Sequence, residues 1–230
     1  MNQPKQFWNK EYRASSYLAL SERPAEDLVK FTRWLLRREG KHTLNPTAHV
    51  LDIGCGNGRN VIYLVGEFGC HGVGIDNSSE ALGQAREAGA KLPLEFKAGS
   101  ITEPLASPDH SFEFVLDMMT SHVLREGERE RFRNEILRVL KPNGWLLFKT
   151  HLKDGDIHSR RLLKHHSADE KDSYIHPRLG VYEHVWSESE IREFFSPNFE
   201  IHKMLRSHKH ILHGKAFKRR TVTVYLQKKN

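Results

Sequence analysis

The segment VLDIGCGNG, residues 50–58, carries the residues most suited to ligand chemistry. Three glycines, Gly54, Gly56 and Gly58, follow the acid Asp52 at the end of an apolar, strand-like run. Glycine lets a backbone come close to a ligand and adopt conformations that other residues avoid. A glycine loop after a first strand, opening a helix, is where an open α/β sheet binds nucleotide-like ligands. The segment therefore predicts such a ligand at the carboxyl ends of the strands.

The spacing of the glycines excludes two common phosphate-binding loops. A dinucleotide-binding loop has the pattern G-x-G-x-x-G, and Arg59 stands where its third glycine is needed. No G-K-[ST] follows, so the loop is not a phosphate loop of the nucleotide triphosphatase type. The ligand need not contain a phosphate.

This segment resembles the glycine motif of class I S-adenosylmethionine-dependent methyltransferases. The resemblance extends from about residue 46 to 152. Asp76 closes GVGID after the second predicted strand, and LRVLKPNGWLLF is similar to the family's helix, Pro-Gly turn and fifth strand. The resemblance implies S-adenosyl-L-methionine as cofactor and S-adenosyl-L-homocysteine as product.

The resemblance also implies roles for the acids near the loop. The three glycines let the backbone approach the methionine tail, and Asp52 serves its ammonium group. Asp76, with Asn77 beside it, lies 22 residues beyond Gly54 and accepts hydrogen bonds from the ribose hydroxyls. The alternative for Asp76 is a helix N-cap.

Two further cofactor contacts are implied by the family's pattern. Residues after the third strand, here Gly99, Ser100 and Ile101, flank the adenine, although the family usually has an acid where Ser100 stands. Asp117 ends the fourth strand beside the expected sulfonium, and an ordinary loop cap is the alternative. Met118 and Met119 are expected to be strand and core residues rather than a sulfur-specific pocket.

The N-terminal segment FWNKEY resembles the aromatic segment that covers the cofactor in related enzymes. It offers Trp8 and Tyr12. A simple packing helix is the alternative.

The methyl acceptor is expected at the rim formed by the loops after the fourth and fifth strands. Transfer from a sulfonium is an in-line displacement, so the protein mainly aligns and desolvates the reactants. A base is needed only for an acceptor that is protonated at working pH. His151, directly after LLFKT, is the first candidate and His184 the second. Further rim candidates are His122, Tyr182 and Glu183.

The histidines raise the question of a metal. Ten of the 15 fall between residues 151 and 213, including HKHILH (His208, His210, His213) and the pair His165 and His166. No cysteine pair, no H-E-x-x-H and no regular ligand spacing accompanies them. The sequence therefore predicts polar surface histidines and no metal site.

Alternating apolar and helical patterns predict the fold class. It is α/β: a doubly wound, mostly parallel seven-stranded sheet with an antiparallel C-terminal strand pair. Strands are expected over residues 49–54, 71–76, 94–99, 112–119, 144–152, 199–212 and 220–229. Helices are expected over residues 23–40, 58–69, 78–90, 127–140 and 187–195.

We expect one domain over residues 1–230, built from four parts. These are an N-terminal helical lid (1–45), the cofactor-binding core (46–152), a rim insertion (153–185) and a C-terminal helix with antiparallel strands (186–230). The segment 153–182 is His-rich and only weakly periodic, which places it on the functional rim.

Composition narrows the class of protein. The chain has 38% hydrophobic and 28% charged residues, no apolar run near the roughly 20 residues of a membrane span, and no apolar secretion signal. With two cysteines, one of them inside the glycine loop, a disulfide framework is not expected. These features predict a cytoplasmic protein, a monomer or homodimer, without a membrane partner.

The net charge of +7 originates at the C-terminus. Residues 201–230 hold nine Lys and Arg and no acid. This excess is either a solvated outer face or a footprint for nucleic acid. The leading hypothesis is methyl transfer to an O or N atom of a small molecule. The alternatives are an RNA methyltransferase using the basic C-terminus and an inactive cofactor-binding module.

Overall fold

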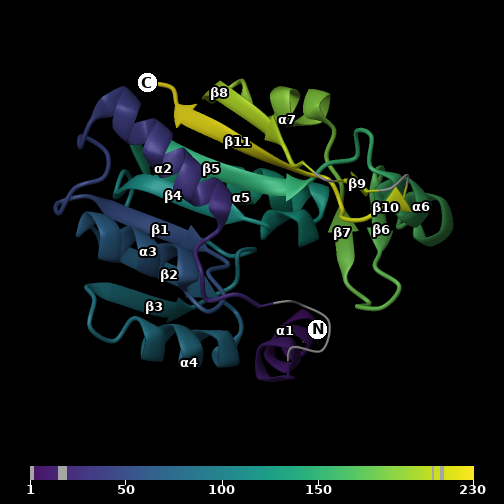
Figure 1. The fold of residues 1–230 in the computed structure, drawn as a ribbon, viewed down its shortest axis with the longest axis horizontal. Coiled ribbons are helices and arrows are strands. Elements are labelled where there is room, and N and C mark those ends of the chain that lie inside the picture. The colour runs from purple at the N-terminus through teal and green to yellow at the C-terminus, as the bar shows by residue number, and fades with distance from the viewer. Residues whose placement is uncertain (1–2, 15–19, 209, 213–214) are drawn as a thin grey trace.

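The computed structural model describes residues 3–14, 20–208, 210–212 and 215–230, and is organised around a seven-stranded sheet (Figure 1). The strands of this sheet are β1 (His49–Ile53), β2 (His71–Asp76), β3 (Leu94–Ala98), β4 (Phe112–Met118), β5 (Leu140–His151), β8 (Phe199–Arg206) and β11 (Thr221–Lys228). Their order is β3-β2-β1-β4-β5-β11-β8. Strand β11 runs antiparallel to β5 and β8, and the pairs from β3 to β5 are parallel. The predicted fold class is confirmed.

Helices cover both faces of the sheet. They are α1 (Gln3–Ala14), α2 (Glu26–Glu39), α3 (Arg59–Phe68), α4 (Ser79–Ala88), α5 (Glu126–Val139), α6 (Ile157–His166) and α7 (Glu188–Phe195), with a short 3₁₀ turn, η1 (Ser121–Val123). In Figure 1, α2 and α3 lie in front of the sheet and α5 lies behind it. Two helical layers enclosing a mostly parallel sheet bury both of its faces.

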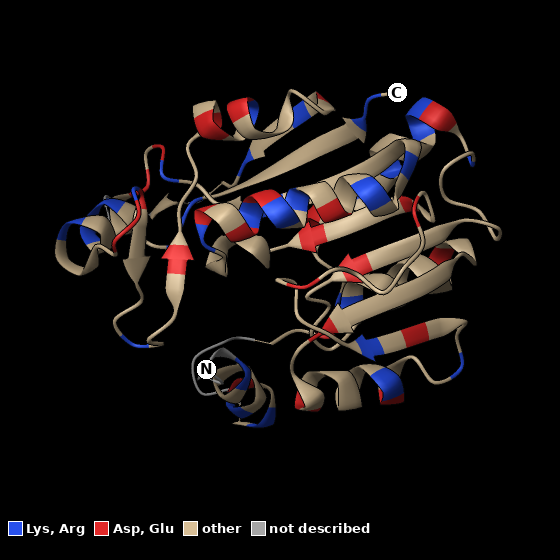
Figure 2. Cartoon of the chain, turned by 180° about the vertical axis from the view of Figure 1, so that it is seen from behind, with Lys and Arg blue, Asp and Glu red and all other residues tan. Residues whose placement is uncertain are grey.

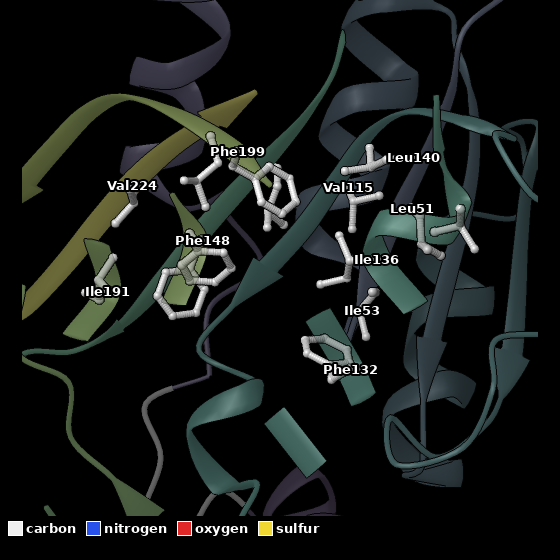
Figure 3. Packing of buried hydrophobic residues seen from close by; sticks show 14 of the residues in the cluster. Leu51, Ile53, Val115, Phe132, Ile136, Leu140, Phe148, Ile191, Phe199 and Val224 are labelled. Carbon is white, nitrogen blue, oxygen red and sulfur yellow. The ribbon is translucent and has the colours of Figure 1, made fainter. Parts of the chain in front are cut away.

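Alternate residues of the central strands enter two separate cores. On the first face, Leu51, Ile53 and Val115 pack with residues of α5 and α7. Figure 3 shows Phe132 and Ile136 of α5 lying against these strand residues. On the opposite face, the intervening strand residues pack with α2 and α3, among them Val50, Phe114, Leu116 and Trp145. This period of two fixes which side chains remain at the strand ends for chemistry.

Local signals set the helix ends as the sequence indicates. Gly58, with φ of +76°, precedes α3, and Gly69, with φ of +69°, closes it. The hydroxyl of Ser78 accepts a hydrogen bond from the amide of Ala81 at 3.2 Å and caps α4. Ser187 forms a capping box with Glu190 at the start of α7. Such caps satisfy amide groups that have no partner inside the helix.

The structure differs from the prediction in the segment 153–182. This segment contains α6 and most of a hairpin formed by β6 (Ser173–Ile175) and β7 (Tyr182–His184). Each of these strands has three residues, too few to show a period of two, and α6 buries only Ser159. In Figure 1 the hairpin and α6 lie beyond the carboxyl ends of β4 and β5. The functional role of this rim stays a prediction, and the regular structure within the segment was missed.

Two strand ends also differ. β5 begins at Leu140 rather than residue 144, because the Pro-Gly turn is accommodated by a register shift against β4. β8 ends at Arg206 and does not continue to residue 212 as expected. A separate antiparallel pair follows, formed by two strands of two residues each, β9 (Ile211–Leu212) and β10 (Lys215–Ala216).

Charged residues are dispersed over the outer helices. Figure 2 shows acidic and basic positions interspersed along the helix in the middle of the view, α5. Within the described ranges, no helix is both long enough and apolar enough to cross a bilayer.

Candidate cofactor and acceptor site

The glycine loop forms a tight turn at the carboxyl end of β1. The amides of Gly54 and Cys55 both donate to the carbonyl oxygen of Ile75, at 2.7 and 3.0 Å, which ties the loop to β2. Gly54 has φ of +68° and Gly56 has φ of +56°. A Cβ at Gly54 would lie 2.3 Å from the side chain of Thr120. Only glycine fits this turn without displacing its neighbours.

Asp76 joins the glycine loop to the start of α4. Its Oδ2 accepts from the amide of Gly56 at 2.9 Å, and its Oδ1 accepts from the amide of Ser78 at 2.8 Å. Burial raises its pKa, and these backbone hydrogen bonds oppose the shift. Ser78 and not Asp76 caps α4, and Asp76 is a half-buried acceptor at the edge of the loop. A carboxylate in this position suits two neighbouring hydroxyl groups of a ribose.

Asp52 is a buried acid with an unsatisfied oxygen. Its side chain is 1% exposed, and its Oδ2 lacks a hydrogen-bond partner among the described residues. Burial, followed by the charge of Asp76, raises its pKa to about 8. A buried carboxylate oxygen without a partner is costly, and an ammonium group would satisfy it. The residues present therefore fit the amino-acid end of S-adenosylmethionine.

Helix α1 lies over the loop and the start of α4. The hydroxyl of Tyr12 lies 2.0 Å from where a Cβ of Gly56 would be, so the phenol packs directly on the glycine backbone. Burial, followed by the charge of Asp76, raises the pKa of this phenol. The Oδ1 of Asn9 accepts from the hydroxyl of Ser78 at 2.8 Å. Trp8 packs edge-on against Phe7 at 5.0 Å between ring centroids and has no described contact with the loop.

The residues expected at the adenine form a local turn after β3. The hydroxyl of Ser100 accepts from the amide of Thr102 at 3.2 Å, and the Ser100 and Thr102 hydroxyls lie 2.7 Å apart. Ile101 packs against the core of the α5 face. Asn77 follows Asp76 at the same edge of the sheet. An adenine contact at Ser100 remains a prediction.

Asp117 is engaged in the turn that follows β4. Its Oδ1 accepts from the amides of Thr120 and Ser121 at 3.2 and 3.1 Å, and burial raises its pKa to about 6. These bonds correspond to the loop-cap alternative, and contact with the sulfonium stays a prediction. Met118 ends β4 and packs at the core, whereas Met119 lies beyond the strand with φ of +68°. Such a backbone strain in a non-glycine residue is uncommon and concentrates at functional turns.

Three rim residues from separate elements come together beside this turn, and we call them the rim cluster. They are His122 of η1, His151 at the end of β5 and Glu183 of β7, and one ligand-type atom from each lies within 4.8 Å of the others. The two imidazole rings meet edge-on, with centroids 5.2 Å apart. Burial lowers the pKa of both histidines, so neutral imidazoles are favoured there. Since His122 lies two residues from Thr120, this group adjoins the cofactor loop.

Two members of the site were missed by the sequence analysis. The Tyr174 hydroxyl donates to Oε2 of Glu183, and an Nη of Arg219 donates to the same oxygen at 2.8 Å. Burial opposes ionisation of Glu183, but His122, Arg219 and these bonds outweigh it and lower its pKa. Arg219 stands in a basic run that was interpreted as surface, and Tyr174 in a strand too short to show a pattern. Neither had a local signal that could have found it.

The remaining rim candidates point to other partners. The Nε2 of His184, the second candidate for a base, lies 2.7 Å from Oε1 of Glu190, and its ring packs edge-on against Trp186. The Tyr182 hydroxyl donates to Glu170. These contacts anchor the rim hairpin, and a catalytic role for His184 stays a prediction.

The histidines expected at the surface divide into two groups. His165, His166 and His208 are exposed. His210 is buried, its Nε2 accepts from the amide of Ile157 at 3.2 Å, and its Nδ1 lies 2.6 Å from the Lys218 carbonyl oxygen. Thus it fixes the start of α6 and is not a surface residue. His213 lies outside the described residues.

Comparison with known proteins identifies the type of domain that this chain contains. Residues 50–144 match the model of a family described as "Methyltransferase domain". A SAM-dependent methyltransferase structure from Methanosarcina mazei superposes with a TM-score of 0.69 at 25% identity, covering 81% of this chain and 95% of that one. Residues 50–144 therefore form a methyltransferase domain, the fold is that of the class I S-adenosylmethionine-dependent methyltransferases, and S-adenosylmethionine is the cofactor that this domain implies.

Curated relatives extend the comparison to named activities. The "Glycine/sarcosine/dimethylglycine N-methyltransferase" of Actinopolyspora halophila is 34% identical over 138 residues, 57% of this chain and 24% of that protein. The "Fatty-acid O-methyltransferase" of Mycolicibacterium smegmatis is 33% identical over 100 residues, 43% of this chain and 35% of that protein. The chain thus spans only a quarter to about a third of the lengths of these two relatives.

Proposed function

We propose that this protein is an enzyme that transfers the methyl group of S-adenosylmethionine to an oxygen or nitrogen atom of a small molecule. The observation that carries the proposal is the junction at Thr120: its side chain touches Gly54, and His122 of the rim cluster follows two residues later. The cofactor loop and the polar rim cluster therefore share one turn. The named relatives that act on small molecules at nitrogen or oxygen agree with this acceptor class.

The cofactor supplies a methyl group activated on a sulfonium. Asp52 would pair with the ammonium of its amino-acid end, and Asp76 would accept from the ribose hydroxyls. The backbone of the glycine loop lies between these two acids, so both ends of the ligand are fixed before the acceptor arrives. Positioning of this kind supplies much of the acceleration of a displacement reaction.

The rim cluster would bind and orient the acceptor. A neutral imidazole of His151 or His122 can accept a proton from an acceptor hydroxyl or ammonium. Tyr12 and α1 would exclude water from the cofactor side. We also propose a cytoplasmic location, since the free thiols of Cys55 and Cys70 suit a reducing compartment; a monomer or homodimer stays a prediction.

The structure offers less support for an RNA acceptor. Of the C-terminal basic residues, Arg206 pairs with Glu188 at 2.5 Å, and Arg219 is directed into the rim cluster. The Nζ of Lys228 donates to the carbonyl oxygens of Leu137 and Leu140. Several cations of the proposed phosphate footprint are thus committed to protein partners.

The test is transfer of label from methyl-labelled S-adenosylmethionine into a cell extract that is then separated into RNA, protein and small-molecule fractions. We expect label in the small-molecule fraction and stoichiometric S-adenosylhomocysteine. Label found only in RNA would show that the methyl acceptor is RNA and not a small molecule. Cofactor binding by calorimetry without any homocysteine product would point to the inactive binding module instead.

A further inference from the structure

The cluster of His122, His151 and Glu183 has the composition of a metal centre. Two imidazoles and one carboxylate form a ligand set that suits zinc and other first-row transition metals. They come from η1, β5 and β7, and all three potential ligand atoms lie within 4.8 Å of one another. Ligand atoms bound to one ion at about 2.1 Å lie closer together than this, so an ion would draw the three side chains inward.

Unsatisfied nitrogen atoms provide a second observation. The Nδ1 atoms of His122 and His151 are buried and have no hydrogen-bond partner among the described residues. A buried polar atom without a partner is costly, because it has lost its hydrogen bonds to water. Two such atoms in adjoining rings, beside an ionised carboxylate, indicate that the cluster is built to meet a ligand.

The charges around the cluster tolerate a cation. Arg219 lies between two buried acids: one Nη is 2.8 Å from Oε2 of Glu183, and its Nε is 3.9 Å from Oδ2 of Asp156. The two carboxylates outweigh the guanidinium by one negative charge. A divalent ion would therefore not face a net positive site.

Neighbouring side chains hold the carboxylate in place. Tyr174, fully buried, and Arg219 both donate to Oε2 of Glu183. Outer partners of this kind orient the ligands in metal sites and tune their basicity. The same two residues had no role in the sequence analysis, and this arrangement gives them one.

We propose that His122, His151 and Glu183 bind one divalent first-row transition-metal ion whose remaining coordination positions accept an oxygen or nitrogen atom of the methyl acceptor. The ion-binding part stands without the proposed function. The acceptor part rests on it and narrows its substrate class to molecules that can coordinate a metal. In the loaded protein the ion, and not an imidazole of His122 or His151, would activate the acceptor, because a metal-bound imidazole has no free lone pair for a proton. The sequence predicted no metal because the three ligands are distant along the chain and follow no short spacing.

The first experiment measures metal binding directly. Protein stripped with a chelator is titrated with Co²⁺ and Zn²⁺, and bound metal is counted by mass spectrometry while cobalt absorption reports the ligand set. We expect about one ion per chain, as a three-ligand site requires. His122→Ala, His151→Ala and Glu183→Gln should each weaken binding by about 100-fold or more, since each removes a ligand.

The control is the double variant His165→Ala/His166→Ala, which removes two exposed histidines of α6 and should leave metal binding unchanged. Cofactor binding by calorimetry verifies that each variant is folded. Less than one ion in ten chains with Co²⁺, Zn²⁺, Ni²⁺ and Mn²⁺, or equal binding by folded cluster variants, would overturn the metal site.

A second measurement tests the open coordination positions. Acetohydroxamate, a small oxygen ligand, should shift the cobalt absorption of the loaded protein; an unchanged spectrum would overturn the acceptor part. Label transfer with and without metal separates the two proposals. Metal binding without any methyl transfer would leave the ion site standing and remove the proposed function, whereas transfer by fully stripped protein would remove the acceptor role of the ion.

Discussion

Gly56 is the residue at which the cofactor loop has the least room. Its φ is +56°, and a Cβ would lie 2.0 Å from the Tyr12 hydroxyl. We expect Gly56→Val to weaken S-adenosylmethionine binding at least tenfold, or by about 1.4 kcal/mol, because the branched side chain strains the turn and displaces Tyr12. Calorimetric titration measures the change. Gly66→Ala is the matched control, since a Cβ at this helical glycine meets nothing within 4 Å; equal affinities of the two variants would contradict the role of the loop.

Asp52 gives a pH-dependent prediction. Its pKa is raised to about 8 by burial, whereas an unfolded Asp releases its proton near pH 4. Between these values the folded state binds more protons, so the free energy of unfolding falls as the pH rises. Asp52→Asn does not titrate at this position. We expect the stability of the ligand-free variant, relative to that of the wild type, to rise by about 1 kcal/mol per pH unit between pH 5 and 7.

Urea unfolding across this pH range measures the difference. The half-buried Asp76 and the buried Asp117 are present in both proteins, and because their charges act on Asp52, the difference between the two curves includes this coupling. A constant difference from pH 5 to 7 would show that Asp52 is ionised throughout, and its assignment as the partner of the ammonium would lose its electrostatic argument.

The glycine loop and its position beside Asp76 could be predicted from the sequence, whereas most of the rim cluster's contacts could not. Gly54, Gly56 and Asp76 lie within 23 residues of one another, in a strand-loop-helix unit with local signals. The candidates His122, His151 and Glu183 were each named for the rim, but only the packing of η1, β5 and β7 shows that they meet. These three residues are far apart in the sequence, so no short motif connects them.

At the scale of elements, α1 is held to α4 by side-chain hydrogen bonds and by the ion pair of Arg13 with Glu80. The Oδ1 of Asn9 accepts from the hydroxyl of Ser78, and the side-chain amide of Gln84 donates to the Tyr12 carbonyl oxygen at 2.8 Å. We expect Asn9→Ala to lose about 1 kcal/mol of docking, with roughly fivefold faster cofactor release and faster proteolysis of α1. Stopped-flow release and limited trypsin digestion measure both. Lys10→Ala, on the exposed side of the same helix, should match the wild type; if Asn9→Ala also does, α1 is not a lid.

The elements that the sequence predicted are those with strong local periodicity. β2 has the predicted bounds, and α3 and α7 differ by a residue at their ends. α6 was missed because it buries little of its surface and has no apolar stripe. The rim hairpin depends on partners that are distant along the chain, such as Arg219 for Glu183, which a local pattern does not reveal.

At the scale of the whole molecule, changes in the basic C-terminus distinguish a small-molecule acceptor from an RNA acceptor. We expect Arg206→Gln/Lys218→Gln to leave methyl transfer to the small-molecule fraction within about twofold, because surface charges contribute little to such a site. Arg219 is left unchanged in this variant because it donates a hydrogen bond to Glu183 of the rim cluster. Lys91→Gln/Arg131→Gln, which removes two exposed charges elsewhere, is the matched control.

Heparin retention and the salt dependence of transfer are the measurements. If the first variant alone abolished transfer, with a loss of the steep salt dependence that phosphate contacts produce, the C-terminal residues would be a nucleic-acid footprint.

The position of β11 in the sheet governs the order in which the molecule can be assembled during synthesis. β11 fills the gap between β5 and β8, and its first residue pairs with His151. A ribosome makes it after every other strand of this sheet, so β5 keeps an open edge until residues 221–228 have emerged from the exit tunnel. Arg219, immediately before β11, reaches Glu183 at the same stage. The contacts of the rim cluster are therefore completed last. A nascent chain can form its cofactor loop well before its acceptor site is complete.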